Sequence, residues 1–229
     1  MKKNFLLFPI LAFIICFTSC SKNNPTTPTT ASVMFVNGCA GTGNVDVSVN
    51  GTKLVAASNL AFLKTSGYQT VTAGTSVDFA FALTATGTPL ISGSENITAG
   101  LSYSVFTGGL VTGTSTSFIG TTDDLTAPAA GMAKVRFANL SSDNLNLNCY
   151  IGTPKIDSNV SMGTITPFFS ISATTTGVNV LLQDPTKPTE LSELSSQNFV
   201  AGKIYTIMLT GTSTGTLASG LTLTVINNN

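Results

Sequence analysis

The chain contains an internal repeat, and this repeat limits the folds that it can adopt more than any other feature. The segment Ala31–Asn37 (ASVMFVN) recurs as Ala133–Asn139 (AKVRFAN), at an offset of 102 residues. In both segments apolar residues alternate, as they do in a β-strand. A period of this length is well above the roughly 20–50 residues of solenoid repeats, so the sequence predicts two tandem copies of one domain.

The repeat extends through most of the chain. Further matches at the same offset are Lys53 with Lys155, Asn96–Gly100 with Asn198–Gly202, and Tyr103 with Tyr205. Between these blocks the offset slips to 100 residues, for example at Tyr68 and Phe168. Loops tolerate changes in length that strands do not, so we expect small insertions and deletions in the loops.

Short segments that alternate apolar and polar residues indicate that each copy is built from β-strands. The apolar rows are Val45, Val47 and Val49 and then Val77, Phe79, Phe81 and Leu83 in the first copy, and Leu147, Cys149 and Ile151 and then Val178, Val180 and Leu182 in the second. The pair Asn50-Gly51 predicts a tight hairpin turn, because both residues accept a positive φ. No segment shows a convincing helical period over three turns.

About seven short strands in roughly 95 residues predict an immunoglobulin-like β-sandwich. We therefore expect an all-β protein with two tandem immunoglobulin-like sandwich domains, over residues 31–126 and 132–229. The linker between them is short and contains Pro128, so we expect the two domains to adopt a limited range of orientations.

The N-terminal segment has the order of features that is typical of an export signal. Lys2 and Lys3 precede an apolar run over residues 5–17, which is too short to span a membrane. The run ends at Phe17-Thr-Ser-Cys20. This ending resembles a bacterial lipoprotein signal of the relaxed Bacteroidetes type, with Phe17 where many such signals have Leu. The resemblance implies that residues 1–19 are removed and that Cys20 carries acyl chains.

Acyl chains on Cys20 would anchor the protein to a membrane, since each buried CH₂ group contributes about 0.8 kcal/mol. Residues 20–30 have the composition of a tether, with Pro25 and Pro28 among Thr and Asn. We expect a lipid-anchored protein of the cell envelope, in the outer membrane, on a periplasmic or surface face that the sequence leaves open. The alternative is an ordinary secretory signal that happens to contain Cys16 and Cys20.

The composition argues against several classes of function. Charged residues make up 9% of the chain, and the sequence contains no cluster of Lys and Arg, so we expect no nucleic-acid partner. His is absent, which removes the commonest general base near neutral pH and the commonest metal ligand. We expect no catalytic residue, no metal and no cofactor, and we interpret the scattered basic residues as ordinary solvated surface.

Several motifs in the two copies resemble one known family. They are Val33–Asn37, Val45–Gly51, Thr70–Gly74, Asp123–Gly131 and Val135–Ser141. In this order they resemble the domain-of-unknown-function family numbered 4397, whose domains occur in tandem in exported bacterial proteins. The resemblance implies β-sandwich domains and an envelope location. It implies no functional residues, because the family has no established activity.

Two thiols remain after Cys20, and they do not occupy equivalent positions of the repeat. Cys39 aligns with Ser141, whereas Cys149 aligns with Val47, so each domain has one Cys and no bridge can form within a domain. A bridge between the domains would need Cα atoms within about 7 Å, and the sequence leaves that pairing open. We interpret Cys149, on the apolar side of its strand, as a small buried hydrophobe.

The acidic residues are the remaining candidates for a site. Asp123-Asp124 is the one adjacent acidic pair, and Asp46, Asp143 and Asp157 lie in or beside predicted turns. A calcium site would need several of these oxygens to converge, and no loop has the spacing of a calcium motif. We therefore interpret these acids as solvated turn residues.

The aromatic residues offer a test between packing and binding. Tyr103 and Tyr205 are equivalent and follow a turn, so we expect their hydroxyl groups to bond a nearby backbone group, as in the tyrosine corner of sandwich domains. Tyr68 and Phe168-Phe169 would support glycan binding if they formed an exposed cluster at one end of a domain, although we expect them to pack inside.

The sequence favours a non-catalytic, lipid-anchored envelope protein with a structural or adhesive role, whose expected partner is a glycan or an envelope protein. A second hypothesis is a module that binds a glycan or another extracellular ligand through the loops at a domain end or through the cleft between the domains. A third, an envelope hydrolase, would need a convergence of carboxylates, or of Ser and Lys, that the sequence does not reveal.

Overall fold

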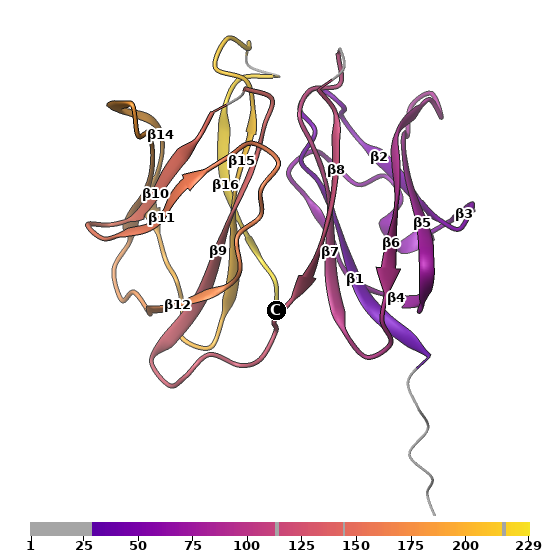
Figure 1. Cartoon of the computed structure of the whole chain (residues 1–229), viewed down its shortest axis with the longest axis horizontal. Helices are drawn as coiled ribbons and strands as arrows, with labels where there is room; N and C mark the ends of the chain where they lie inside the picture. Colours follow the sequence, from indigo (N-terminus) through magenta and orange to yellow (C-terminus); the bar gives the residue numbers. More distant parts are fainter. Residues whose placement is uncertain (1–28, 113–114, 144, 217–218) are drawn as a thin grey trace, which may run out of the picture.

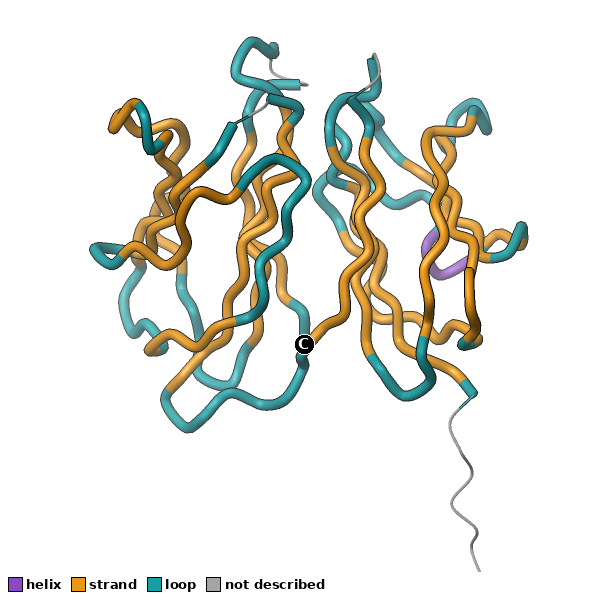
Figure 2. Tube along the Cα trace, viewed as in Figure 1, coloured by secondary structure: helices purple, strands orange, loops and turns teal. Residues whose placement is uncertain are grey.

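The computed structural model describes residues 29–112, 115–143, 145–216 and 219–229, with the backbone alone for residues 187–190. The predicted signal peptide and Cys20 therefore lie outside the described residues. The described chain contains sixteen strands and one 3₁₀ turn (Figure 2), which confirms the predicted all-β fold. Within these residues, no helix has the length and apolar composition needed to cross a membrane.

Eight strands form each domain. The strands of the first domain are β1 (Thr30–Asn37), β2 (Val45–Val49), β3 (Thr52–Lys53), β4 (Thr65–Thr72), β5 (Gly74–Leu83), β6 (Pro89–Ile97), β7 (Ser102–Gly108) and β8 (Ser117–Asp123), with the 3₁₀ turn η1 (Val55–Ala57) after β3. Those of the second domain are β9 (Met132–Ser141), β10 (Leu147–Ile151), β11 (Lys155–Val160), β12 (Phe169–Ser172), β13 (Val178–Asp184), β14 (Lys187–Gln197), β15 (Ile204–Gly211) and β16 (Thr222–Asn227).

The two domains have the same topology. In the first domain the strands form sheets with the orders β3-β2-β5-β6 and β4-β1-β7-β8. The sheets of the second domain have the orders β11-β10-β13-β14 and β12-β9-β15-β16, so every strand has a counterpart eight strands later. In both domains the first strand runs parallel to the seventh, as β1 does to β7 and β9 to β15. The shared topology agrees with the duplication that the repeat predicts.

The four sheets stack in four layers (Figure 1). The sheets β4-β1-β7-β8 and β12-β9-β15-β16 lie in the middle and face each other, and we call them the inner sheets. The sheets that contain β2 and β10 lie on the two outsides. Each domain has its own core between its inner and outer sheet, and a third apolar cluster lies between the two domains.

The outer sheets follow the predicted alternation, because one of their faces meets the core and the other meets water. Along β5, Val77, Phe79 and Phe81 are buried and Asp78 and Ala80 are exposed. The predicted turn after β2 is also present, since Asn50 and Gly51 have φ values of 47° and 76°. These elements confirm the local prediction.

The central strands of the inner sheets are buried on both faces. On β1, Val33 and Phe35 enter the core of the first domain, whereas Met34 and Val36 enter the cluster between the domains. On β9 every residue from Ala133 to Ser141 is buried. A strand whose two faces both meet protein needs no polar alternation, which explains the continuous apolar character of segments such as VMFV.

Candidate functional site at the domain interface

The two domains meet through an apolar surface. The first domain contributes Met34, Val36 and Phe106, and the second contributes Ala138, Leu140, Met208 and Ile226; each of these side chains is at most 7% exposed. The backbone also joins the domains, since the N–H of Gly109 donates a hydrogen bond of 2.9 Å to the carbonyl oxygen of Leu140. The linker is therefore not the main constraint on the domains, because direct packing fixes their orientation.

An arginine lies inside this interface. Arg136, in the middle of β9, is 1% exposed and is the largest fully buried side chain among the described residues. Its Nη1 donates a hydrogen bond of 2.6 Å to Oδ1 of Asp123, whose side chain is 0% exposed. Asp123 closes β8 of the first domain, so this ion pair crosses the interface. An unpaired charge at this depth would be strongly unfavourable, and the pairing is what makes its burial possible.

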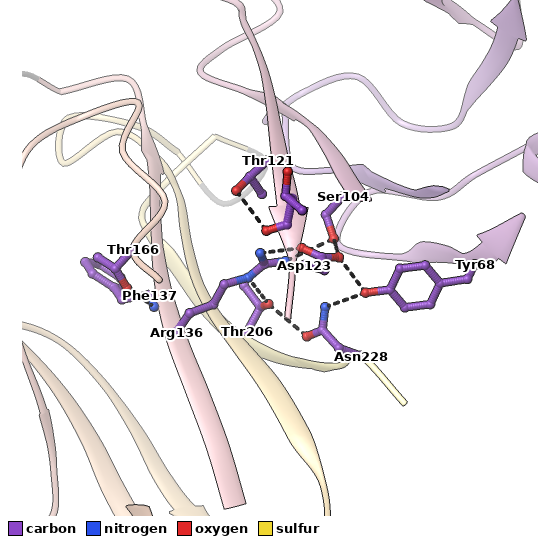
Figure 3. A network of polar contacts seen from close by, with 10 residues as sticks. Tyr68, Ser104, Thr121, Asp123, Arg136, Phe137, Thr166, Thr206 and Asn228 are labelled. Carbon is purple, nitrogen blue, oxygen red and sulfur yellow. Dashed lines mark hydrogen bonds and ion pairs between the residues drawn. The ribbon is translucent and has the colours of Figure 1, made fainter. Parts of the chain in front are cut away.

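Polar groups bond the rest of the guanidinium (Figure 3), and two aromatic rings lie against it. Its Nε donates to Oγ1 of Thr206 at 2.8 Å, and its Nη2 donates to Oγ of Ser104 at 2.9 Å. The guanidinium carbon lies 4.3 Å from the ring centroid of Phe168 and 5.5 Å from that of Phe106. Such cation–π contacts favour a guanidinium over an aliphatic cation at this position.

The carboxylate of Asp123 is equally well satisfied. Its Oδ2 accepts hydrogen bonds of 2.5 Å from the hydroxyl of Tyr68 and of 2.5 Å from the hydroxyl of Ser104. Asn228 completes the circuit, because its Nδ2 donates to the Tyr68 oxygen at 3.3 Å and its Oδ1 accepts from Thr206 at 2.8 Å. The result is a closed network of six polar residues, five of which form hydrogen bonds across the interface (Figure 3).

The pKa values of Tyr68 and Arg136 keep both groups protonated, which suits a structural role. Burial raises the pKa of Tyr68, and the negative charge of Asp123 raises it further, so Tyr68 remains a hydrogen-bond donor at any ordinary pH. Burial lowers the pKa of Arg136, and the charge of Asp123 opposes that change. Arg136 stays protonated, because an arginine begins from a pKa above 12.

Each member of the network has a counterpart on the other side of the interface. Strand register makes Met34 the counterpart of Arg136 and Ser104 the counterpart of Thr206. Tyr68 corresponds to Phe168, which follows from the offset of 100 residues in this part of the repeat. Asp123 corresponds to Asn228, since these two residues pair with Ser102 and Ile204 at the starts of β7 and β15. The duplicated face has thus diverged into two complementary faces.

A second pair of equivalent positions differs in side-chain size, so that one domain leaves space for a side chain of the other. Gly38 is the counterpart of Leu140 at the repeat offset. A Cβ atom on Gly38 would lie 2.6 Å from the carbonyl oxygen of Thr107 and 2.8 Å from Cδ1 of Leu140. The glycine in the first domain therefore leaves the space that the leucine of the second domain fills.

The sequence-based interpretation of two residue groups was wrong. Asp123 is not a solvated turn acid but a strand residue in a buried ion pair. The basic residues are not all solvated surface, because Arg136 is buried and Lys134 is 8% exposed, with its Nζ 2.7 Å from Asp124. The available signal was the charge of Arg136 at a repeat position where the first copy has the apolar Met34.

The other predicted acids do not converge. Asp46 pairs with Lys53 on the surface of the first domain, and Asp143 accepts hydrogen bonds from Thr212 and Ser213 in the second. Asp157 lies on β11, at the edge of an outer sheet. Within the described part of the chain, no group of three or more Cys, Asp or Glu residues has the geometry to hold a metal ion.

The two thiols are buried and free. Cys39 and Cys149 are each 0% exposed and form no disulfide. Burial raises the pKa of Cys39 to about 11, and burial also raises the pKa of Cys149. Both thiols are therefore poor nucleophiles in the folded state, in line with the interpretation of Cys149 as a small buried hydrophobe.

The prediction for the two equivalent tyrosines is confirmed, and Tyr68, Phe168 and Phe169 pack against neighbouring residues, as expected. The hydroxyl of Tyr103 accepts a hydrogen bond of 3.0 Å from the N–H of Thr98, and that of Tyr205 accepts one of 3.1 Å from the N–H of Val200. Phe168 packs on Arg136 inside the interface and does not join Tyr68 in an exposed patch.

An apolar groove opens in the second domain, between the edge strands β11 and β12. It has a volume of about 450 Å³, and its lining includes Ile151, Ile156, Phe169, Ile171 and Val178, with Lys155 at its side. The first domain has a smaller groove of about 320 Å³ at the equivalent edge, where Gln69 replaces Phe169 on the strand.

Comparisons with known proteins place the chain in a family without assigning an activity. It is similar to the C-terminal domain of AlgF from P. aeruginosa, with 21% identity and a TM-score of 0.32 over 42% of this chain and 98% of that one. It is also similar to a candidate cell adhesion protein from Bacteroides uniformis, with 11% identity and a TM-score of 0.25 over 88% of this chain and 100% of that one. No curated protein matches it. The model of the family described as "Domain of unknown function (DUF4397)" matches residues 31–150, which is just over half of the chain, so the chain belongs to the DUF4397 family.

Proposed function

We propose that this chain is a non-catalytic protein of the cell envelope, anchored in the outer membrane through acyl chains on Cys20. In this proposal the two sandwich domains act as one rigid body in a structural or adhesive interaction with another macromolecule of the envelope. The lipoprotein-type sequence that ends at Cys20 is the basis for the anchor.

The observation that carries the proposed role is the interface between the domains. Arg136 and Asp123, which could otherwise take part in ionic or acid–base chemistry, are buried there, and together with the half-buried Tyr68 they satisfy one another. Side chains that bond one another in this way hold the two domains in one orientation and are not free to act on a substrate. A rigid pair of sandwiches suits a protein that bears load or presents a surface at a fixed position.

The anchor is tested by replacing the predicted lipidated residue. We expect Cys20→Ser to leave the membrane fraction, whereas the control Cys16→Ser, four residues earlier in the apolar run, remains there. Mass spectrometry of the N-terminal peptide should find acyl chains on Cys20 in the wild type. A wild-type protein that begins at another residue, or that carries no acyl chain, would overturn the anchor.

The face of the membrane is tested by adding protease to intact cells. Loss of the protein, with a periplasmic control uncut, would support surface exposure and an adhesive role. Protection would contradict the adhesive role and would direct the search for a partner to the periplasm.

A second candidate function, the binding of an extracellular ligand such as a glycan, is favoured by the groove between β11 and β12. Its volume of about 450 Å³ lies within the range of small-molecule sites, and its apolar walls are flanked by Lys155 and several hydroxyl groups. Ile171→Thr should weaken the binding of any ligand that is found in a glycan screen. The matched control Val71→Thr, at the equivalent position of the first domain, should not.

A further inference from the structure

The chain enters the described structure at one end of the double sandwich. β1 begins at Thr30, and the carbonyl oxygen of Thr30 accepts a hydrogen bond of 2.8 Å from the N–H of Gly100, in the turn between β6 and β7. Figure 1 shows the same turn beside the start of β1, together with the turn between β14 and β15 and the connection from β8 to β9. We call this the entry end of the molecule.

The entry end exposes apolar side chains from both domains. Leu101, in the turn between β6 and β7, is 45% exposed, and Val200, in the turn between β14 and β15, is 53% exposed. These are two of the four large exposed hydrophobic residues in the described part of the chain. The other two, Val55 and Met162, follow β3 and β11, away from this end.

Other residues at the entry end extend the apolar character. The connection from β8 to β9 contributes exposed Ala127, Ala129 and Ala130. Lys203 is an exposed cation three residues after Val200, and its Nζ donates a long hydrogen bond of 3.5 Å to the main-chain oxygen of Asn229, which leaves its other protons free to meet solvent or headgroups. A small apolar surface beside a cation suits the boundary of a bilayer that contains anionic lipid, where apolar side chains enter and cations meet headgroups.

We propose that the entry end rests on the membrane, with Leu101 and Val200 inserted at the headgroup boundary. This inference rests on the proposed anchor at Cys20, and it adds the surface through which the folded body contacts the lipid. The ten Cα–Cα steps from Cys20 to Thr30 span at most about 35 Å, so the tether allows contact but does not enforce it.

A weak contact is sufficient because the anchor keeps the body near the lipid. A short tether produces an effective concentration of about 1 mM or more, so a contact with a dissociation constant of that order is occupied roughly half of the time. Two apolar turns and one cation are a contact of this modest kind.

The test uses tryptophan as a depth reporter, because the chain contains no Trp of its own. Leu101→Trp and Val200→Trp place the reporter at the entry end, and Ala85→Trp, at an exposed position in the turn between β5 and β6, places it at the opposite end. The mature chain, from residue 20 onward, carries an N-terminal histidine tag. It is attached to nickel-chelating vesicles of phosphatidylethanolamine and phosphatidylglycerol, with or without brominated phosphatidylcholine. Attachment then does not depend on acylation.

We expect bromolipid to reduce the emission of the two entry-end reporters by about a quarter, because the contact is occupied roughly half of the time and a ring within about 5–10 Å of the acyl boundary is then partly quenched. Emission of the Ala85→Trp control should not change. Because Trp itself favours the interface, the quenching of Leu101→Trp should also fall when Val200→Asp is added.

Equal emission with and without bromolipid at both entry-end positions would overturn the contact, and so would equal quenching of the control. Neither result concerns acylation, which is read separately from the mass of the Cys20 peptide. Failure of the contact and failure of the anchor are thus distinguishable.

Discussion

The ion pair between Arg136 and Asp123 is the place where a single substitution should cost the most stability. Arg136→Met introduces the residue that the first domain has at the equivalent position, Met34, so the change is compatible with the size of the site. It leaves Asp123 as a carboxylate that is 0% exposed, with the hydroxyl groups of Tyr68 and Ser104 as its remaining donors.

Breaking a buried ion pair by removing one partner costs about 3–5 kcal/mol, because the other charge stays buried. We expect a loss of this size for Arg136→Met and a similar loss for Asp123→Asn. The double variant should lie within about 1 kcal/mol of the wild type, since replacing both members of a buried pair is often neutral. Asn is the residue that the second domain has at the position of Asp123, namely Asn228.

The measurement is urea unfolding of the mature chain, followed by circular dichroism. With a slope of about 2 kcal/mol per molar urea, each single variant should lower the midpoint by about 2 M, and the double variant should recover most of it. The control is Lys53→Met, which breaks the exposed pair with Asp46 and should cost at most about 1 kcal/mol. The reasoning fails if the single variants behave like this control, or if the double variant is as unstable as their sum.

Three further predictions follow from other features. Gly38→Ala should destabilise the protein by about 1–3 kcal/mol in the same urea assay, because its Cβ would lie 2.6 Å from the carbonyl oxygen of Thr107. Wild-type stability of this variant would contradict the close packing of Leu140 against Gly38. Hydrogen bonds from Lys134 and Thr126 lower the pKa of Asp124 from 3.8 to about 2, so the folded state binds this proton less readily than the unfolded chain. The stability that this lower pKa contributes is present above pH 4 and is lost as the pH falls towards 2. Asp124→Asn should therefore flatten that part of a pH–stability curve, and an unchanged curve would refute the lowered pKa of Asp124. Finally, both buried thiols should react with a thiol reagent only as fast as the protein opens, so prompt reaction of native protein would contradict their burial.

Much of the fold could be predicted from the sequence because the repeat and the alternation are local signals. The row of Val77, Phe79 and Phe81 identifies a strand with one solvent-exposed face, and Asn50-Gly51 identifies the turn between β2 and β3, without reference to any distant residue. The equivalence of Tyr103 and Tyr205 likewise identified two hydroxyl groups that bond the backbone of a neighbouring turn.

The interface between the domains could not be predicted in the same way. Segments such as VMFV and VRFA indicate burial on both faces of a strand, but a sequence does not say whether the second face meets another sheet or another chain. Asp123 and Arg136 lie at the end of β8 and in the middle of β9, on different domains, so only the packed structure brings them within 2.6 Å. Comparison of the two copies, residue by residue, is the signal that points to such differences.

The divergence of the two inner sheets also affects how the chain can be made. In the proposed export the N-terminal half arrives first, so β1–β8 can fold before β9 is available. During that interval the apolar face with Met34 and Phe106 has no cover, and Asp123 has no counter-charge. Nascent chains with such a bare face are prone to self-association until the second half arrives. We therefore expect a chain truncated between the halves to aggregate rather than to form a smaller stable protein.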